Sequence, residues 1–432
     1  MSSENRPRRI LIYSHDSFGL GHLSRCRTIA NALVSADEHL SVLIISGSPI
    51  VGSFDFRARV DFVRVPGVIK LRNGEYDSLN LRIDVGHTIR MRETIIRDTG
   101  EIFEPDMFIV DKEPLGLRGE VAATLELLKK RGTRLVLGLR DVMDEPTKLA
   151  PEWKRKNVLP ALRDLYDDIW IYGLPQINDP LAGIGLPKSV RRKIVYTGYL
   201  RRSVPQGGDD PAVLRDLDGP YLLVTAGGGG DGAALVDWVL RAYEFDPRIP
   251  YPAIMVFGPF MQPEAREAFR QRAERLSGRV RTVTFETDLG QLMSRAAGVV
   301  AMGGYNTFCE ILSFDCKALI VPRTRPRLEQ YIRAQCARSA GLVNMLPDNG
   351  RRDPKVMATA LRQLPQQAPP SQAVIPGLLD GLPNVAKLVA RSFEMPVRGP
   401  QVVSTDAESE SDSTVYEQPD GQHPVGVPLV RG

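Results

Sequence analysis

Cysteine, long apolar runs and net charge are all scarce in this sequence. Its four cysteines form no CxxC pair and have no histidine at metal-ligand spacing, which argues against a zinc site and a disulfide framework and fits a reducing cytoplasm. No stretch reaches the about 18 apolar residues of a membrane span, and the N-terminus has no apolar signal region. We therefore expect a cytoplasmic protein whose contact with a membrane, if it has one, is peripheral.

Length and composition indicate an ordinary globular protein of two domains. The formal net charge of +4 is small for 432 residues, so we expect no nucleic-acid partner. Hydrophobic residues make up 43% and charged residues 25% of the chain, as in most globular proteins. A chain of this length exceeds the size at which one hydrophobic core keeps growing. Partners have to be inferred from local sites.

Short apolar segments alternate with helical stretches, and each half of the chain begins with a strand, a Gly-containing loop and a helix. This alternation predicts parallel sheets covered on both faces. The expected fold class is α/β, with two Rossmann-like doubly wound domains facing each other across a cleft. The segments expected as strands are 9–14, 41–46, 60–65, 106–111, 134–139 and 168–172 in the first half, and 221–225, 253–257, 280–285, 298–302 and 318–321 in the second.

Changes in composition indicate where the domains end. Residues 207–220 are rich in Gly, Asp and Pro, as linkers are, and the chain beyond Pro396 has little apolar material. We expect an N-terminal acceptor-side domain at 1–205, a C-terminal donor domain at 206–395 and a disordered tail at 396–432. The helical spacing of residues 384–393 would allow that segment to pack against either domain.

Two glycines mark the most informative loop. Gly303 and Gly304 lead from a buried strand into a helix expected at 308–314, where unpaired backbone N–H groups and the helix dipole suit a diphosphate. Glu310 lies about one turn into this helix, within reach of ribose hydroxyls. A tight turn and a solvated glutamate would also explain these residues, but not the strand and Glu-Gln pair that follow. The same candidate donor site includes Asn306, Thr307, Glu329 and Gln330.

The run MGGYNTFCEILSFDCKALIVPRTRPRLEQYIRAQCARSAG resembles the C-terminal donor-binding signature of the family 28 glycosyltransferases, which include the enzyme that forms lipid II. The resemblance covers about residues 8–393 and is looser in the first half. It implies a GT-B fold and metal-independent transfer from a nucleotide-diphosphate sugar donor, with Glu310 on the ribose and Gln330 on the sugar hydroxyls. The family often has Gln at the position of Glu329 and His-Lys-Asp at 325–327, and these departures leave the donor sugar open.

The resemblance also assigns donor-binding roles outside this run. Arg202 corresponds to an arginine near the phosphates, where a guanidinium would offset charge on a departing diphosphate. The basic segment 323–327 could meet a donor phosphate, an anionic acceptor or only solvent. The remaining positions are Phe285 and Glu286 beside the uracil, Gly228 and Gly229 in a second phosphate-facing loop, and Gly21 in the first loop.

The loop at 14–25 (SHDSFGLGHLSR) supplies the candidate catalytic base. His22 lies at the start of the following helix, where the dipole disfavours the protonated imidazole and leaves a neutral base. Asp111 ends an apolar strand and is expected at the same sheet edge, where it would orient the imidazole or meet the acceptor. Purely structural roles remain open for both residues. His15 is a weaker candidate, and Arg140, Asp141 and Asp144 are further residues for the acceptor side.

These observations predict a glycosyltransferase that moves a sugar from a nucleotide diphosphate, expected to be UDP, to the hydroxyl of an unidentified acceptor. The acceptor could be a sugar, a small molecule or a lipid-linked compound. No cofactor or metal is expected, because Asp216 and Asp218 fit a turn better than a metal site. One alternative is a nucleotide-sugar hydrolase, since GLGHLSRC also resembles the GxGHxxRC loop of hydrolases in sialic-acid-like sugar pathways. Another is a non-catalytic nucleotide-sugar-binding protein.

Overall fold

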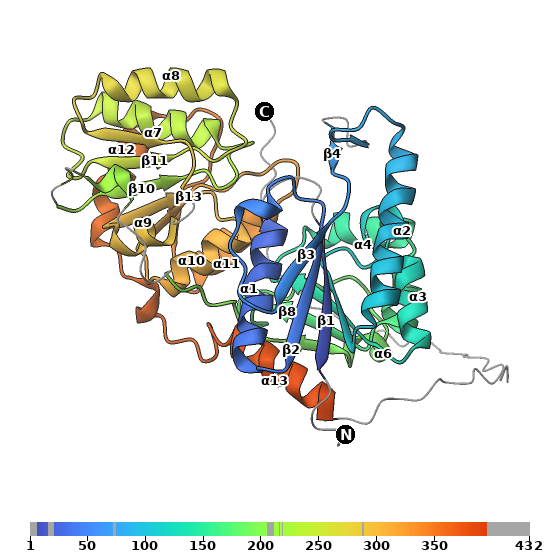
Figure 1. Cartoon of the computed structure of the whole chain (residues 1–432). Coiled ribbons are helices and arrows are strands. Elements are labelled where there is room, and N and C mark those ends of the chain that lie inside the picture. Colours follow the sequence, from blue (N-terminus) through green and yellow to red (C-terminus); the bar gives the residue numbers. More distant parts are fainter. Residues whose placement is uncertain are drawn as a thin grey trace.

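The computed structural model describes residues 7–15, 21–71, 75–204, 211–215, 217, 219–286 and 289–394. The loop residues 16–20, Asp216, Asp218 and the tail expected at 396–432 lie outside these residues. Two parallel sheets organise the described part of the chain, each with helices on both of its faces (Figure 1). The α/β class and the two Rossmann-like domains predicted from the sequence are thereby confirmed.

The first domain is built on a seven-stranded parallel sheet of order β3-β2-β1-β6-β7-β8-β9. Most of its strands are almost wholly apolar and buried, as the sequence predicts for a sheet covered on both faces. A short antiparallel hairpin, β4 with β5, stands apart from the sheet. The strand bounds are β1 Arg8–Ser14, β2 Leu40–Ser46, β3 Val60–Arg64, β4 Val68–Lys70, β5 Tyr76–Ser78, β6 Met107–Asp111, β7 Arg134–Arg140, β8 Asp168–Tyr172 and β9 Ile194–Tyr196.

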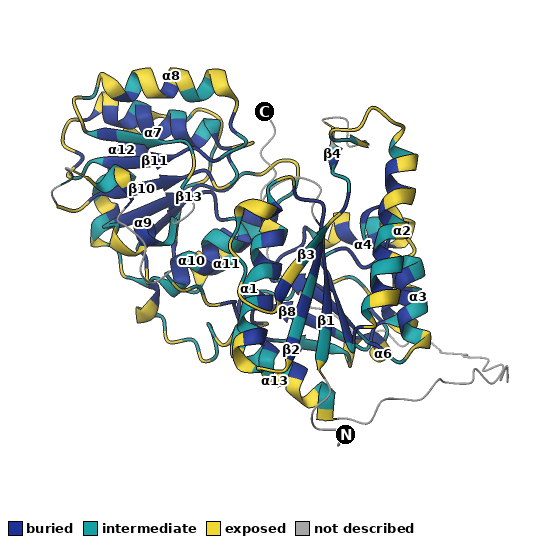
Figure 2. Ribbon diagram, viewed as in Figure 1, coloured by how far each residue is buried: buried dark blue, intermediate teal, exposed yellow. Residues whose placement is uncertain are grey.

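Helices cover both faces of this sheet. Apolar residues of α2, α3 and α4 pack on one face, and those of α1 pack on the other. In Figure 2 the strands are largely buried, whereas the outer face of α2 is exposed. The helix bounds in this domain are α1 Gly21–Ala36, α2 Val85–Phe103, α3 Ala122–Lys130, α4 Pro146–Arg155, α5 Val158–Pro160 and α6 Lys188–Arg191.

The second domain repeats the plan on a six-stranded parallel sheet of order β12-β11-β10-β13-β14-β15. Its strands are β10 Leu222–Thr225, β11 Ala253–Val256, β12 Val280–Val283, β13 Gly298–Ala301, β14 Ala318–Ile320 and β15 Asn344–Met345. Its helices are α7 Ala233–Phe245, α8 Pro263–Glu274, α9 Leu289–Arg295, α10 Tyr305–Ser313, α11 Glu329–Ser339 and α12 Pro354–Gln363. The helices α7, α8 and α12 pack on one face of the sheet, and α9, α10 and α11 pack on the other.

The inner faces of the two domains share one apolar core. A single cluster of buried residues includes Leu23 of α1, Phe308 of α10 and Ala334 of α11. Hydrophobic burial is therefore continuous from one sheet to the other. The domains meet through packed side chains as well as through the polar contacts described below.

The last helix returns to the first domain. α13, Gly381–Glu394, packs beside α1, and Asn384 Nδ2 donates to Thr197 O at 2.9 Å (Figure 1). The Arg8 guanidinium lies 5.1 Å from the Phe393 ring. The expected boundary assigned residues 206–395 to the second domain, whereas 381–394 pack on the first. The periodicity of this segment predicted the helix but could not say which domain it would contact.

Candidate functional site

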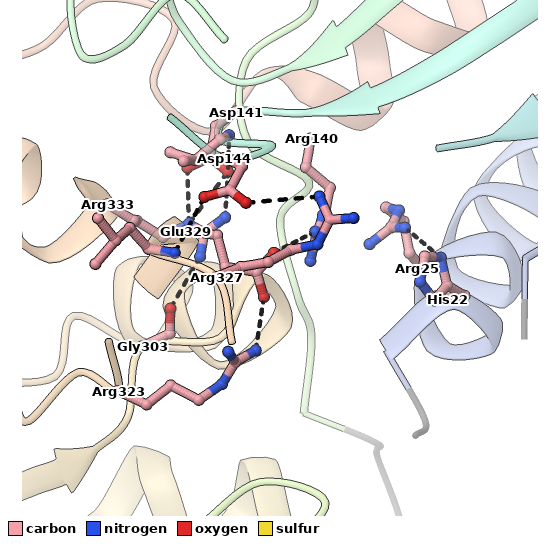
Figure 3. Close-up of polar contacts among 12 residues, drawn as sticks. His22, Arg25, Arg140, Asp141, Asp144, Gly303, Arg323, Arg327, Glu329 and Arg333 are labelled. Atoms are coloured by element: carbon pink, nitrogen blue, oxygen red, sulfur yellow. Dashed lines mark hydrogen bonds and ion pairs between the residues drawn. The ribbon is translucent and has the colours of Figure 1, made fainter. Parts of the chain in front are cut away.

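The first part of the site lies at the carboxyl edge of the first sheet. β1 and β6 are parallel neighbours, so the residues that follow them meet at one edge. His22, in the first turn of α1, contacts Asp111 Oδ2 through Nδ1. Arg25, one turn further along α1, donates to both carboxylate oxygens of Asp111 at 2.8 Å. The Arg25 Nη2 atom lies 3.1 Å from His22 Nδ1 (Figure 3). The structure brings the two predicted catalytic residues together and adds Arg25, which binds the same carboxylate.

Burial and charge set the protonation states of this group. Burial lowers the pKa of His22 below 6.5, and Asp111 offsets only part of that effect. Burial alone would raise the pKa of Asp111, but Arg25 and His22 outweigh it and hold the pKa well below its usual range. At neutral pH Asp111 is an anion that accepts a hydrogen bond from the Nδ1–H group of a neutral His22. His22 Nε2, which has no hydrogen-bond partner among the described residues, keeps its lone pair.

His15, the weaker candidate base, lies close by but is less accessible. Its ring centroid is 5.5 Å from that of His22, and its Nδ1 atom is 3.4 Å from the Tyr13 hydroxyl. His15 is buried, whereas His22 is partly exposed. Burial also holds the pKa of His15 well below 6.5. Of the two imidazoles, His22 is the better placed to meet an acceptor hydroxyl.

The second part of the site is the N-terminus of α10. The helix begins at Tyr305, earlier than the expected 308, so its first turn directly follows Gly304. Gly303 has φ +79°, and a Cβ there would lie 2.8 Å from Ile320 Cγ2, so this position requires glycine. Gly304 is the N-cap and makes no side-chain cap bond, and a Cβ built on it would meet no atom within 4 Å. Thr307 belongs to the same turn. Open space therefore faces a helix end suited to an anion.

Hydrogen bonds join the two parts of the site. Asn306, in the first turn of α10, donates from Nδ2 to Gly21 O at 2.9 Å. Its Oδ1 atom accepts from Arg202 Nη2 at 2.8 Å, and Arg202 also reaches Thr28 of α1. Gly21, Arg202 and Asn306, predicted from three separate segments, thus form one group beside the α10 N-terminus. A phosphate at this end would meet the Arg202 guanidinium.

Glu310 is a partly buried carboxyl group without a hydrogen bond or an ion pair among the described residues. Burial raises its pKa from 4.5 to about 7, and the charge of Arg202 offsets this only in part. A desolvated carboxylate in a folded protein is unfavourable unless it finds donors. The two hydroxyls of a ribose would supply such donors, in line with the role that the resemblance implies for Glu310.

Glu329 and Gln330 begin α11 and are both 8% exposed. Glu329 is already engaged, since it accepts from Arg140 Nη2 of the first domain at 2.5 Å and from Arg323 Nη2 at 2.9 Å. Burial raises the pKa of Glu329, but Arg140 and the other nearby cations together hold it well below the usual range. Gln330 Oε1 accepts from the Arg323 amide at 3.1 Å. The Gln330 amide nitrogen makes no hydrogen bond with the described residues, while Glu329 holds an interdomain ion pair.

A buried ion pair fixes the Gly303 loop to the first domain. Arg333 of α11 donates to both oxygens of Asp141 at 2.6 to 3.1 Å, and its Nη1 atom donates to Gly303 O at 3.0 Å (Figure 3). Arg333 and Asp141 are each 1% exposed. The Tyr199 hydroxyl adds a donor to Asp141 at 3.1 Å. The Asp141 carboxylate, expected to line the acceptor side, instead orients the loop that carries Gly303.

The second Gly loop is tightly packed against the strand-end segment at 257–258. Gly229 has φ +87°, and a Cβ there would lie 2.3 Å from Phe257 O. Gly228 O accepts from the Phe260 amide at 2.9 Å. The Gly258 amide in turn donates to Thr284 O at 2.9 Å, which connects this loop to the segment that carries Phe285 and Glu286. Phe285 is 38% exposed and is therefore available to a ligand.

Sequence reasoning missed two charged residues of the site, Arg25 and Lys112. Arg25 follows His22 by three positions on α1, so helical spacing places the two side chains on one face. Lys112 directly follows Asp111 and adopts φ +69°, which is uncommon for a residue other than glycine. Burial lowers the pKa of Lys112 to about 8. Its position after a strand that ends in an acid was the one available signal.

Within the described ranges, no group of three or more His, Cys, Asp and Glu side chains could hold a metal ion. Nor does this part of the chain contain a helix with the length and apolar character needed to cross a membrane. The cysteines that the structure describes are all free thiols.

Comparisons with known proteins agree with this architecture. No family model matches the chain. It is 23% identical over 398 residues to a protein of Methanosarcina acetivorans named as an uncharacterized glycosyltransferase, and the match covers 87% of this chain and 96% of that protein. The chain is also similar in structure to TcCGT1 in complex with UDP, with a TM-score of 0.64, 14% identity, and coverage of 90% of this chain and 99% of that one.

Two further solved structures extend the comparison. The calicheamicin glycosyltransferase CalG4 gives a TM-score of 0.55 at 14% identity, and MurG of Acinetobacter baumannii gives 0.54 at 11% identity. Each match covers 90% of this chain and 99% of the other. The fold is therefore of the GT-B type, with two Rossmann-like domains. Since MurG, CalG4 and TcCGT1 all share this fold with the chain, membership of family 28 stays a proposal.

Proposed function

We propose that this protein is a metal-independent glycosyltransferase that moves a hexosyl group from a UDP-sugar to an acceptor hydroxyl. The observation that carries the proposal is the contact between the two halves of the site. A neutral His22 oriented by Asp111 lies in the first turn of α1, and Asn306, at the uncapped start of α10, donates to the adjacent Gly21 carbonyl. The relative named as a glycosyltransferase and the UDP complex of a similar fold support the same reading.

In the proposed reaction, each of these residues has a separate role. His22 Nε2 takes the proton of the acceptor hydroxyl, and Asp111 holds the Nδ1 proton and stabilises the imidazolium that forms. The acceptor oxygen bonds to the anomeric carbon, and the bond from that carbon to the phosphate oxygen breaks with its electron pair leaving on UDP. The α10 N-terminus and Arg202 stabilise the charge on the departing diphosphate.

Donor recognition uses a separate set of side chains. In this proposal Glu310 accepts from the ribose hydroxyls, Gln330 contacts the sugar, and Phe285 and Glu286 border the uracil. The Glu310 carboxyl group supports this role, because it has no partner among the described residues and a bound ribose would supply hydrogen-bond donors.

The test combines binding with turnover. The full chain is titrated with UDP and with a panel of nucleotide sugars, and UDP release is then measured with and without a mixture of sugar, small-molecule and lipid-linked acceptors. UDP should bind and raise the melting temperature, and its release from a UDP-sugar should depend on an acceptor. His22→Ala should lower turnover by about 100- to 10,000-fold and keep UDP affinity.

The experiment also needs a matched control, and two outcomes would contradict the proposal. His39→Ala replaces an exposed histidine and should leave turnover unchanged. The donor assignment fails if no nucleotide diphosphate binds. Transfer is ruled out as the activity if no acceptor changes the rate at which the sugar is released into water.

A further inference from the structure

One pair of cations near His22, Lys112 and Arg140, has fewer neutralising contacts than the other buried cations of the site. Arg25, Arg92 and Arg333 each donate from two nitrogens to a single carboxylate. Arg140 is also largely buried, at 11% side-chain exposure, yet among the described residues it makes a single hydrogen bond, to Glu329. Its Nε atom is buried without a partner. A hydrogen-bond donor is thus left unsatisfied on Arg140.

Lys112 is the second member of the pair. Its ammonium group makes no hydrogen bond or ion pair with the described residues, although the side chain is only partly exposed. The neighbouring acid Glu113 is held instead by Lys156 at 2.9 Å. The two positive charges repel each other. Burial first, and then the charge of Arg140, lower the pKa of Lys112. Burial also lowers the pKa of Arg140, which Glu329 only partly restores.

Lys112 and Arg140 lie at the same sheet edge as the proposed reacting groups. Arg140 ends β7 and Lys112 follows β6, the adjacent parallel strand, so both lie at the sheet edge that carries Asp111. Figure 3 shows Arg140 between the Glu329 group and the His22–Arg25 pair. Lys112 directly follows Asp111, whose carboxylate contacts His22 Nδ1, and the charge of Lys112 also lowers the pKa of His22.

We propose that Lys112 and Arg140 form a subsite for an oxyanion, a carboxylate or phosphate carried by the substrate beyond the donor diphosphate. An oxyanion would accept from the Lys112 ammonium and from the partly exposed Arg140 guanidinium, whose one hydrogen-bond partner among the described residues is Glu329. The Lys112 amide donates a hydrogen bond to Gly138 O at 2.8 Å and so holds the residue in a left-handed conformation, a type of backbone strain that is found at functional sites.

The donor diphosphate itself is assigned elsewhere. It belongs at the start of α10 beside Arg202, whereas Arg140 reaches Glu329 at the start of α11. The oxyanion therefore lies either on the transferred sugar, as in a uronic acid, or on the acceptor. This inference rests on the proposed function for the identity of the substrate, but the subsite itself can be tested without turnover.

Calorimetric titration of the full chain distinguishes the two sources. UDP-glucose and UDP-glucuronate, which differ at one carboxylate, are compared for the donor. Inorganic phosphate and glucuronate are titrated into the chain with and without saturating UDP for the acceptor. We expect at least tenfold tighter binding of UDP-glucuronate than of UDP-glucose if the donor sugar carries the anion. If the acceptor carries it, phosphate or glucuronate should bind the UDP-saturated chain.

Variants test whether Lys112 is responsible. Lys112→Met should lose the oxyanion preference by at least tenfold, and Lys112→Arg should retain most of it. Lys148→Met is the control, because Lys148 is exposed and pairs with Glu145 within α4 and its cap. Should Lys112→Met fail to fold, Arg140→Gln and the wild-type titrations still test the subsite.

The outcomes separate the subsite from the proposed function. The subsite is refuted if wild type binds UDP but prefers no oxyanion probe, or if the preference survives in Lys112→Met. If UDP does not bind, the donor assignment fails, and the titrations without UDP still show whether Lys112 binds phosphate or glucuronate.

Discussion

Replacement of Glu310 by glutamine should stabilise the protein and weaken its donor binding at the same time. Burial raises the pKa of Glu310 from 4.5 to about 7, so above pH 7 the folded state carries a desolvated carboxylate. At ~1.4 kcal/mol per pKa unit, with allowance for the partial exposure of the side chain, the charge destabilises the fold by about 2 to 3 kcal/mol. Glu310→Gln removes the charge and keeps the shape.

The size of the stability gain depends on pH. Between pH 4.5 and about 7 the folded state retains a proton that the unfolded state has released, so stability falls as pH rises through this window. Glu310→Gln should therefore gain about 2 to 3 kcal/mol over wild type at pH 8 and little at pH 4.5. In contrast, its UDP affinity at pH 8 should fall by about tenfold or more, because charged hydrogen bonds to the ribose are lost.

Urea denaturation at both pH values, with UDP titration at pH 8, measures the two effects. Glu274→Gln serves as the control, since Glu274 is an exposed residue of α8. An equal change in stability at pH 4.5 and pH 8 would refute the burial argument. Unchanged UDP affinity would refute the ribose contact, even if the stability gain appears.

Two other perturbations address the catalytic group and the domain interface. Because burial lowers the pKa of His22 below 6.5, kcat/KM measured against pH should stay level down to about pH 6.5 and fall below it as the imidazole gains a proton. A fall that begins near pH 8 would contradict His22 as the base. Asp141→Asn leaves the buried charge of Arg333 uncompensated, so urea denaturation should show a loss of about 3 kcal/mol or more, whereas Asp98→Asn, in an exposed ion pair, should change stability little. A loss no larger than that of Asp98→Asn would contradict this account.

The elements that the sequence predicted well are those determined by local pattern. β6 and β13 are short apolar runs, and both were expected to within a residue because burial on two faces demands continuous apolar sequence. The Gly303 turn was predictable for a similar reason, since a strand, two glycines and a helix follow each other directly. His22 and Asp111 could be paired because parallel strands place their carboxyl ends at one edge.

Contacts between residues far apart in the chain could not be predicted from local sequence pattern. The ion pair between Arg333 and Asp141 joins residues far apart in the chain, and neither has a neighbour in sequence that indicates its partner. Glu329 was expected in the donor site, but its two arginine partners depend on how the domains pack. Roles of individual donor-site residues, including Gln330 and Arg202, stay predictions until a ligand is measured.

The return of α13 makes the second domain an insertion within the first, with consequences for synthesis of the chain. The first domain contributes its sheet before residue 200 and its last helix only at 381–394. On the ribosome, the α1 surface that α13 covers stays exposed until the whole donor domain has been made. Truncation before Gly381 would therefore damage the domain that is synthesised first, leaving apolar surface of α1 open to aggregation.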